Sequence, residues 1–416
     1  MSAPIPSPAP SAAPLARWLS VVGIGEDGLD GLTPRGRALI DGAEALVGGA
    51  RHLAMIPDDG RPRLTWPRPL TALMPQIAEY AGRPVCVLAT GDPMSYGIGV
   101  TLARHFAAAE MEIVPSLSAF SLAAARLGWP LADVEQLTLH GRPTALIVPF
   151  VQPGARLLVL SDGAETPAEI ARLLVDCGYG ESRLTVLEHM GGPRERSLAD
   201  TAAAWRANEV APFNTLAVEC IAGPGAALLP RVPGLPDEVF ATDGNMTKRE
   251  VRAATLAALA PVPGQHLWDV GAGSGSVAIE WMRAHPACRA TAIERRGERI
   301  ALIARNAVAL GAPKLGMAEG EAPDAFAGLD APDAVFVGGG AATPGLLAAC
   351  WDALLPGGRL VANAVTLEGE AALLAFRAVC GGNLSRITVS RAEPVGPFTG
   401  WKPLMTVTQL AAAKPR

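Results

Sequence analysis

The sequence lacks the features that mark membrane proteins and nucleic-acid-binding proteins. No stretch approaches the roughly 20 consecutive apolar residues that a membrane-spanning helix needs. The net charge is −5 over 416 residues, with acidic and basic residues intermixed, so the basic surface that neutralises nucleic-acid phosphates is not indicated. We therefore expect neither a membrane nor a nucleic acid as a partner.

Signs of disulfides and of metal sites are also missing. The six cysteines are widely scattered, form no CxxC pair, and have no histidines at ligand spacing. We predict no metal site, reduced thiols and a cytoplasmic location. Residues 1–17 are rich in Pro, Ala and Ser and lack the basic start and apolar centre of a secretory signal. We predict that they form a disordered tail.

The length exceeds what one hydrophobic core usually organises, which indicates two domains. From Trp18 onward, short apolar runs alternate with helical segments, a pattern typical of α/β folds with largely parallel sheets. Residues 223–235 concentrate Pro and Gly without periodicity and are predicted to be a linker. The predicted domains are therefore residues 18–222 and 236–416. No internal repeat relates them, so they are expected to be two different α/β domains.

Nine segments are predicted to be strands. They are residues 18–25, 84–91, 155–163, 182–190 and 214–220 in the first domain, and 265–271, 289–295, 333–339 and 358–365 in the second. Helices are predicted to begin at Thr33-Pro34, at Thr166-Pro167 and near Lys248, where a Thr can cap the first turn.

The second domain contains a glycine-rich turn between a predicted strand and a predicted amphipathic helix, in HLWDVGAGSGSVAIEWM. Its spacing is GxGxG, and Ser276 stands where a dinucleotide-binding GxGxxG motif would have glycine. Such a turn lets backbone N–H groups approach a ligand, while Asp269 can meet an ammonium group. The predicted cofactor contacts of this segment are Asp269, Gly271, Ala272, Gly273, Ser274 and Gly275.

Two downstream positions complete the pattern of an S-adenosylmethionine site. Glu294 ends the next predicted strand, where an acid can accept both hydroxyls of a ribose. Glu321 and Ala322 lie in a loop that can flank the adenine. The alternatives are a tight turn with only a structural role, and a nicotinamide oxidoreductase, which Ser276 argues against.

Upstream of this turn, the segment MTKREVR places three cations at a predicted helix start. Thr247 and Glu250 have the spacing of a capping box, which gives Thr247 a structural role. Lys248, Arg249 and Arg252 stand where the helix dipole favours acids, which suggests that they face anionic ligand groups. A solvated basic face is the alternative.

In the first domain the most informative motif is Gly91-Asp92-Pro93, directly after an apolar strand. Such an exposed turn has backbone groups free to bind a ligand. The loops around Ser118, around His140 and Arg142, and around His189 are further candidates, although each alone also fits a structural loop.

These first-domain segments occur in an order that resembles the tetrapyrrole methylase superfamily over roughly residues 18–222. The resemblance rests on VVGIGEDG, VLATGDPMSYGIG, EIVPSLSAFSLAAARLG, LTLHGRP and VLEHMGGPRER. It implies a fold of two α/β lobes with S-adenosylmethionine in the cleft between them. The cofactor contacts that it implies are Gly91, Asp92, Pro93, Ser118 and Ala119. The superfamily usually has paired serines where this chain has Pro115-Ser116-Leu117-Ser118-Ala119.

From about residue 235 onward, GLPDEVFATDGNMTKREVR followed by LWDVGAGSGSVAIEW resembles the decarboxylating precorrin methyltransferase domain of the cobalamin pathway. This resemblance implies a Rossmann-like class I methyltransferase domain. It also implies cofactor contacts from Thr247, the glycine turn, Glu294 and Ala322, and assembly as a homo-oligomer, for which the resemblance implies a tetramer.

The two resemblances together imply an S-adenosylmethionine-dependent C-methyltransferase with one cofactor in each domain and a tetrapyrrole substrate. The first domain is expected to methylate carbon 5, and the second to methylate carbon 15 and decarboxylate the ring C acetate. Because the substrate carries many carboxylates, we expect cations at the sites, with Lys248, Arg249, Arg252 and Arg142 as candidates. A cobalt-containing substrate and a non-catalytic tetrapyrrole-binding protein remain alternatives.

Overall fold

The computed structural model describes residues 17–206 and 209–416, so the predicted tail lies outside the described residues except for Arg17. The chain divides into two compact units. Unit 1 comprises the described residues up to Gly141, together with Arg156–Arg172 and Glu181–Glu219, and unit 2 comprises Arg142–Ala155, Leu173–Gly180 and Cys220–Arg416. Within the described ranges, no helix has the length and apolar character needed to span a bilayer.

The first sheet of unit 1 is parallel throughout, as predicted, with strand order β3-β2-β4-β1-β5. Its strands are β1 (Leu19–Ile24), β2 (Ala45–Gly48), β3 (Arg63–Thr65), β4 (Val85–Thr90) and β5 (Met111–Val114). Separate apolar clusters cover its two faces, one with α1 (Pro34–Asp41) and α2 (Ala50–Ala54), the other with α3 (Met74–Ala78) and α4 (Ile98–Leu102). The predicted cap is confirmed, because Thr33 Oγ1 accepts a hydrogen bond from Gly36 N at 3.1 Å.

The second sheet of unit 1 is mostly antiparallel, so the prediction of parallel pairing was wrong here. Its order is β6-β7-β10-β8-β9, and only β6 and β7 are parallel. The strands are β6 (Glu135–Thr138), β7 (Arg156–Leu160), β8 (Arg183–Glu188), β9 (Arg196–Thr201) and β10 (Asn214–Glu219). The connection from β8 to β9 is too short for the crossover that parallel strands require. Helices α5 (Ala119–Leu127) and α6 (Thr166–Asp176) accompany this sheet.

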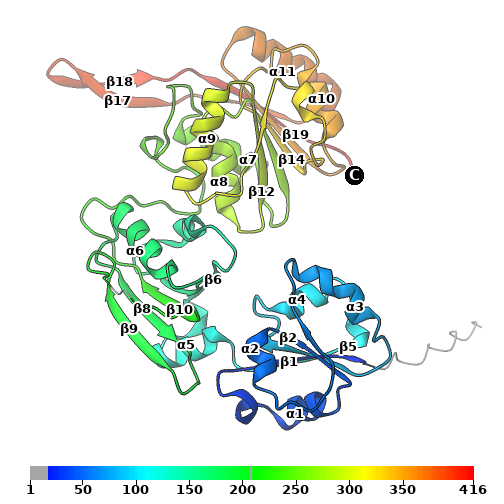
Figure 1. Cartoon of the computed structure of the whole chain (residues 1–416). Coiled ribbons are helices and arrows are strands. Elements are labelled where there is room, and N and C mark those ends of the chain that lie inside the picture. Colours follow the sequence, from blue (N-terminus) through cyan, green and yellow to red (C-terminus); the bar gives the residue numbers. More distant parts are fainter. Residues whose placement is uncertain (1–16, 207–208) are drawn as a thin grey trace, which may run out of the picture. The chain divides into compact units, whose positions relative to one another are not determined.

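Unit 2 is built on a seven-stranded sheet with order β13-β12-β11-β14-β15-β19-β16. The strands are β11 (His266–Val270), β12 (Arg289–Glu294), β13 (Gly316–Glu319), β14 (Ala334–Val337), β15 (Arg359–Ala364), β16 (Asn383–Ile387) and β19 (Val407–Ala413). The first five are parallel and the last two pair antiparallel. One face packs on α7 (Arg249–Leu259), α8 (Ser276–Ala284) and α9 (Gly297–Ala309), and the other on α10 (Leu346–Ala353) and α11 (Leu367–Cys380) (Figure 1).

A long hairpin of unit 2 was not predicted. Strands β17 (Ser390–Val395) and β18 (Phe398–Pro403) form a two-stranded sheet of their own within the described residues and extend away from the seven-stranded sheet (Figure 1). The base of the hairpin is fixed by Arg391, whose Nη2 lies 2.8 Å from Asp237 Oδ2 and 2.7 Å from Glu250 Oε2. The hairpin therefore stands out from the unit on a fixed base.

Candidate active sites

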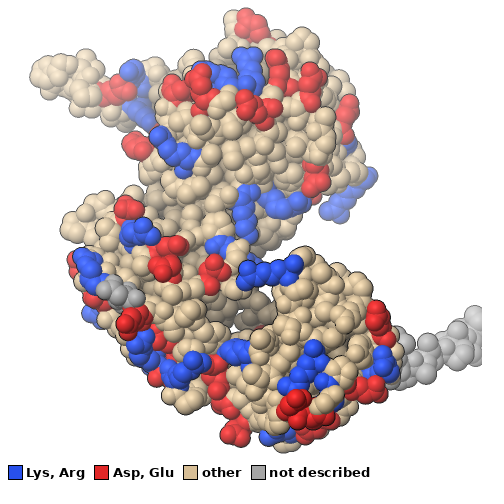
Figure 2. Space-filling model, viewed as in Figure 1, with Lys and Arg blue, Asp and Glu red and all other residues tan. Residues whose placement is uncertain are grey.

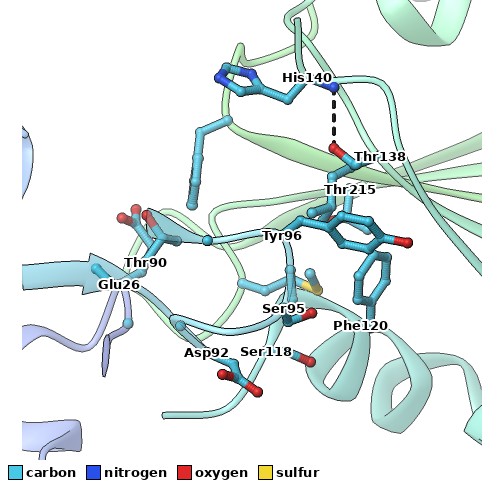
Figure 3. Close-up of a pocket in the computed structure, with 18 of the residues that line it drawn as sticks. Glu26, Thr90, Asp92, Ser95, Tyr96, Ser118, Phe120, Thr138, His140 and Thr215 are labelled. Atoms are coloured by element: carbon cyan, nitrogen blue, oxygen red, sulfur yellow. Dashed lines mark hydrogen bonds between the residues drawn. The ribbon is translucent and has the colours of Figure 1, made fainter. Parts of the chain in front are cut away.

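A cavity of about 600 Å³ lies inside unit 1, where the ends of strands from both sheets meet. Its walls come from the turn after β1, the turn after β4, the start of α5 and the loop between β8 and β9. Figure 3 shows Tyr96 and Phe120 side by side at one wall, with ring centroids 6.0 Å apart. Tyr96 Oη donates a hydrogen bond to the Gln136 carbonyl at 3.0 Å, which ties the turn after β4 to β6.

The turn after β4 lies against the backbone of its neighbours. Gly91 has φ +55°, its N–H bonds to the Ile24 carbonyl at 3.1 Å, and its own carbonyl accepts from Ser116 N at 3.2 Å. A Cβ at Gly23 would stand 1.8 Å from the Gly91 carbonyl oxygen. The two glycines therefore let the ends of β1 and β4 approach closely. The expectation of an exposed turn with free backbone groups does not hold at Gly91, which is buried and whose N–H and carbonyl both bond within the chain.

The predicted contacts of the first domain fall partly on this cavity. Gly91, Asp92, Ser118 and Ala119 line it, whereas Pro93 and Arg142 are not among its lining residues. Ser118 caps α5, since its Oγ accepts from Ser121 N at 3.0 Å. Its hydroxyl is thus already occupied in capping a helix.

An ionic cluster at the cavity was not predicted as a unit. Glu26 lies in the turn after β1 and its Oε2 is 2.8 Å from His189 Nδ1. Arg51 pairs with Glu26 Oε1, and Arg194 Nη2 lies 3.7 Å from Oε2. Burial, then the charge of Arg194, lower the pKa of His189, and burial with Arg51 lowers the pKa of His52 to about 4. Both histidines are therefore neutral near pH 7.

In unit 2 the predicted glycine turn joins β11 to α8. Gly271, Gly273 and Gly275 have φ values of +70°, +60° and +74°, a region that favours glycine. The N–H of Gly271 and that of Ala272 both point to the Ile293 carbonyl, at 2.9 and 3.3 Å. The spacing GxGxG thus follows from the backbone path of this turn.

Glu294 is brought against this turn, as the sequence suggested. It ends β12 and is 4% exposed. Its Oε2 accepts from Gly273 N and its Oε1 from Arg296 N, each at 3.1 Å. The loop with Glu321 and Ala322 joins the same place, because Gly320 N bonds to the Glu294 carbonyl at 3.1 Å. The Glu321 carboxylate itself is 71% exposed and lies 3.6 Å from Arg295.

Asp269 is buried beneath the turn. It is 1% exposed, and its Oδ2 accepts a hydrogen bond from Ala278 N at 3.0 Å. Burial, and to a lesser degree the charge of Glu294, raise the pKa of Asp269 to about 7. A cation placed beside it would favour the ionised form.

One predicted ligand cation is a structural residue instead. Arg252 is fully buried. Its Nε donates a hydrogen bond to Glu280 Oε1 at 2.6 Å. Its Nη1 donates to Asp237 Oδ1 at 3.1 Å and to the Thr247 carbonyl at 2.6 Å. Its Nη2 donates to the Leu235 carbonyl. The prediction that Arg252 faces an anionic ligand is wrong, because acids from the preceding segment and from α8 occupy its guanidinium.

The other two cations lie at the start of α7. The helix begins at Arg249, and Lys248 is its N-cap without a side-chain hydrogen bond, so the predicted capping box from Thr247 does not form. Lys248 is half-buried and Arg249 is exposed. The nearby Asn245 carbonyl would lie 3.4 Å from a Cβ at Gly273, which places this loop over the glycine turn.

Basic and acidic side chains are intermixed over the face drawn in Figure 2. Among the described residues, no group of three or more His, Cys, Asp or Glu side chains is arranged to hold a metal ion.

Sequence reasoning missed Glu26, Arg51 and Arg194 as members of one cluster. They lie in separate segments, and only the fold brings the two arginines to Glu26, which lines the cavity. The available signal was the glycine-rich turn VGIGED after the first strand, whose glycines alone are a weak indication.

Known proteins match both parts of the chain. The family described as tetrapyrrole (corrin/porphyrin) methylases matches residues 19–204, and the precorrin methyltransferase domain matches residues 238–414. The chain is 49% identical over 401 residues to a precorrin-6Y C(5,15)-methyltransferase [decarboxylating] of a Sinorhizobium species, covering 95% of this chain and 96% of that protein.

Two shorter relatives from Salmonella typhimurium each match 43% of this chain. One is a cobalt-precorrin-7 C(5)-methyltransferase, 37% identical over 180 residues and covered to 88%. The other is a cobalt-precorrin-6B C(15)-methyltransferase (decarboxylating), 35% identical over 186 residues and covered to 96%.

Proposed function

The chain belongs to the family of decarboxylating precorrin-6Y C(5,15)-methyltransferases, which depend on S-adenosylmethionine, and we propose that it converts precorrin-6B to precorrin-8 in cobalamin biosynthesis. The reaction adds methyl groups at carbons 5 and 15 and removes the ring C acetate carboxyl as carbon dioxide. The observation that carries this proposal is the union of both family matches in one chain. The full-length relative is named without cobalt, which favours the metal-free substrate.

We propose one S-adenosylmethionine for each domain. In unit 2 the residues fit this cofactor: Gly271 and Gly273 have positive φ values and no side chains that would obstruct a ligand, and Glu294 lies beside the turn. In unit 1 the turn at Gly91 and the start of α5 line one cavity. When bound, the cofactor supplies a methyl group on a cationic sulfonium, which an electron-rich carbon of the macrocycle attacks.

The protein's own contribution is to bind and to orient. In this proposal the two turns, Glu294 and the aromatic wall of Tyr96 and Phe120 position the reactants, and such positioning lowers the entropic part of the barrier. Loss of carbon dioxide leaves an electron pair that the conjugated macrocycle delocalises until the former acetate carbon takes up a proton from solvent, so the protein's part is to enclose and orient the acetate. We assign carbon 5 to the first domain, and carbon 15 with decarboxylation to the second.

Mass spectrometry tests the overall reaction. Full-length protein, S-adenosylmethionine and metal-free precorrin-6B should give a product with two methyl groups gained and one carbon dioxide lost. One methyl group or none would contradict the proposal, and turnover only of the cobalt form would assign the cobalt substrate instead.

A single variant tests the assignment of the two domains. Glu294→Ala should reduce cofactor binding from two equivalents per chain to one, measured by calorimetry, because Glu294 holds the turn at Gly273. It should also abolish carbon 15 methylation while a substrate already methylated and decarboxylated there is still methylated at carbon 5. Glu298→Ala is the matched control, since that carboxylate is 82% exposed on α9. Loss of carbon 5 methylation by Glu294→Ala would reverse the assignment.

We further propose that unit 2 mediates self-association as a tetramer through the β17–β18 hairpin. Val395, Phe398, Trp401 and Met405 on and beside the hairpin are 62%, 77%, 78% and 71% exposed. Apolar side chains gathered on a projecting element usually mark an interaction surface.

Light scattering on the full chain tests this assembly. A double variant, Phe398→Ser with Trp401→Ser, should lower the particle mass to that of one chain. The control is Val379→Ser on α11, where an equally exposed apolar residue lies outside the hairpin. An unchanged mass in the double variant would contradict the proposal. We also propose a cytoplasmic location, where the six free thiols would stay reduced.

A further inference from the structure

Two arginines from separate elements of unit 1 converge on one carboxylate at the cavity. Arg51 belongs to α2 and Arg194 to the loop between β8 and β9. Both pair with Glu26, which is 7% exposed and lines the cavity. Figure 3 shows Glu26 at the cavity wall beside Thr90. Arg51 Nη2 lies 3.3 Å from Thr90 Oγ1, so its guanidinium contacts a residue that lines the cavity.

The cluster carries an excess of positive charge. Among the described residues, Glu26 is the one carboxylate that pairs with both guanidiniums, so two positive charges face one negative charge. The lowered pKa values of His52 and His189 leave both rings neutral near pH 7. The neighbouring Glu188 is occupied by Arg196 and by Ala211 N. Burial, and to a lesser degree the charge of Arg194, lower the pKa of Arg51.

The rest of the cavity offers no such cations. None of its described lining residues is Lys or Arg, and its acidic lining residues besides Glu26 are Asp92 and Asp162. A macrocycle with many carboxylates therefore needs a cationic group at the margin of this cavity. Arg51 is well placed because its guanidinium lies 4.2 Å over the Phe213 ring, which limits its rotation.

We propose that Arg51 and Arg194 bind a side-chain carboxylate of the macrocyclic substrate in unit 1, while Glu26 holds the two guanidiniums in place when no substrate is bound. The inference rests on the proposed carbon 5 methylation. Planar guanidinium groups bind carboxylates through paired hydrogen bonds. Arg194, with 70% of its side chain exposed, can turn to an incoming carboxylate without disturbing the core.

The test uses the full chain and a substrate already methylated and decarboxylated at carbon 15. Arg194→Gln should raise the KM for the macrocycle about tenfold or more, with kcat within about twofold, because a charge-assisted hydrogen bond made in the ground state is lost. Arg194→Lys should recover part of the affinity. Arg172→Gln is the matched control, since Arg172 is an exposed arginine of α6 that is not among the partners of Glu26, and the KM of this variant for the macrocycle should equal that of the wild type.

Glu26→Gln gives a second readout of opposite sign. Removing the competing anion should lower the KM for the macrocycle, whereas a purely structural role of the cluster would raise it. S-adenosylmethionine also carries a carboxylate that the two arginines could bind. The Kd of S-adenosylmethionine is therefore measured by calorimetry on the same variants. If Arg194→Gln weakens only cofactor binding, or leaves the macrocycle KM at the wild-type value, the inference is wrong. Inactive wild-type protein would instead refute the proposed function.

Discussion

Arg252→Leu should destabilise unit 2 without acting on the substrate directly. The wild-type guanidinium is fully buried and makes hydrogen bonds to Glu280, Asp237 and two backbone carbonyls. Removal of the cation leaves Glu280, which is 3% exposed, as a buried carboxylate that keeps the N–H groups of Gly234 and Leu235 but has lost its ion pair with Arg252.

The size of the effect follows from this geometry. Breaking a buried ion pair on one side costs about 3–5 kcal/mol, and for a unit of this size each kcal/mol lowers Tm by roughly 2–4 °C. We therefore expect the unit 2 transition to fall by about 6–20 °C. Calorimetry of the full chain measures this transition, and hydrogen exchange in α7 and α8 identifies it as belonging to unit 2.

Arg249→Leu is the control, because this arginine is exposed one turn earlier in the same helix and such a change is usually worth less than about 0.5 kcal/mol. If the unit 2 transition of Arg252→Leu has the same Tm as that of Arg249→Leu, but Arg252→Leu binds the macrocycle more weakly than the wild type does, then Arg252 faces a ligand. Our assignment of a structural role would then be refuted.

Two further predictions concern the cofactor turns. Because burial raises the pKa of Asp269 from 3.8 to about 7, its proton stabilises the folded state fully below about pH 4, and this contribution is lost as the pH rises through 7. Asp269→Asn should therefore show a smaller loss of stability between pH 4 and 8 in urea titrations; equal losses in both proteins would contradict the shifted pKa. Gly23→Ala would place a Cβ 1.8 Å from the Gly91 carbonyl oxygen, so we expect weaker cofactor binding in unit 1, while calorimetry should show one remaining equivalent bound in unit 2. Two equivalents bound as in the wild type would mean that β1 and β4 separate without cost.

Local sequence patterns predicted the elements that show a continuous apolar run or a short turn motif. The strands around Val21, Val87 and Leu267 were recognised because both sides of a parallel strand are buried, which gives continuous apolar runs. The β17–β18 hairpin was missed because its exposed residues show no such run. The pairing of the second sheet was misjudged because apolar runs do not specify whether neighbouring strands are parallel or antiparallel.

The sequence by itself determined the two glycine turns and the acid at the end of β12. A turn with positive φ values requires glycine at those positions, and Glu294 directly follows the apolar run of its strand, so both can be recognised from neighbouring residues. Only the tertiary structure decided which cations are available to a ligand. Arg252 and Arg194 are equally basic in the sequence, but the fold surrounds the first with Glu280 and Asp237 and leaves the second 70% exposed beside a cavity. The availability of a charge depends on partners distant in the chain, and no local pattern specifies them.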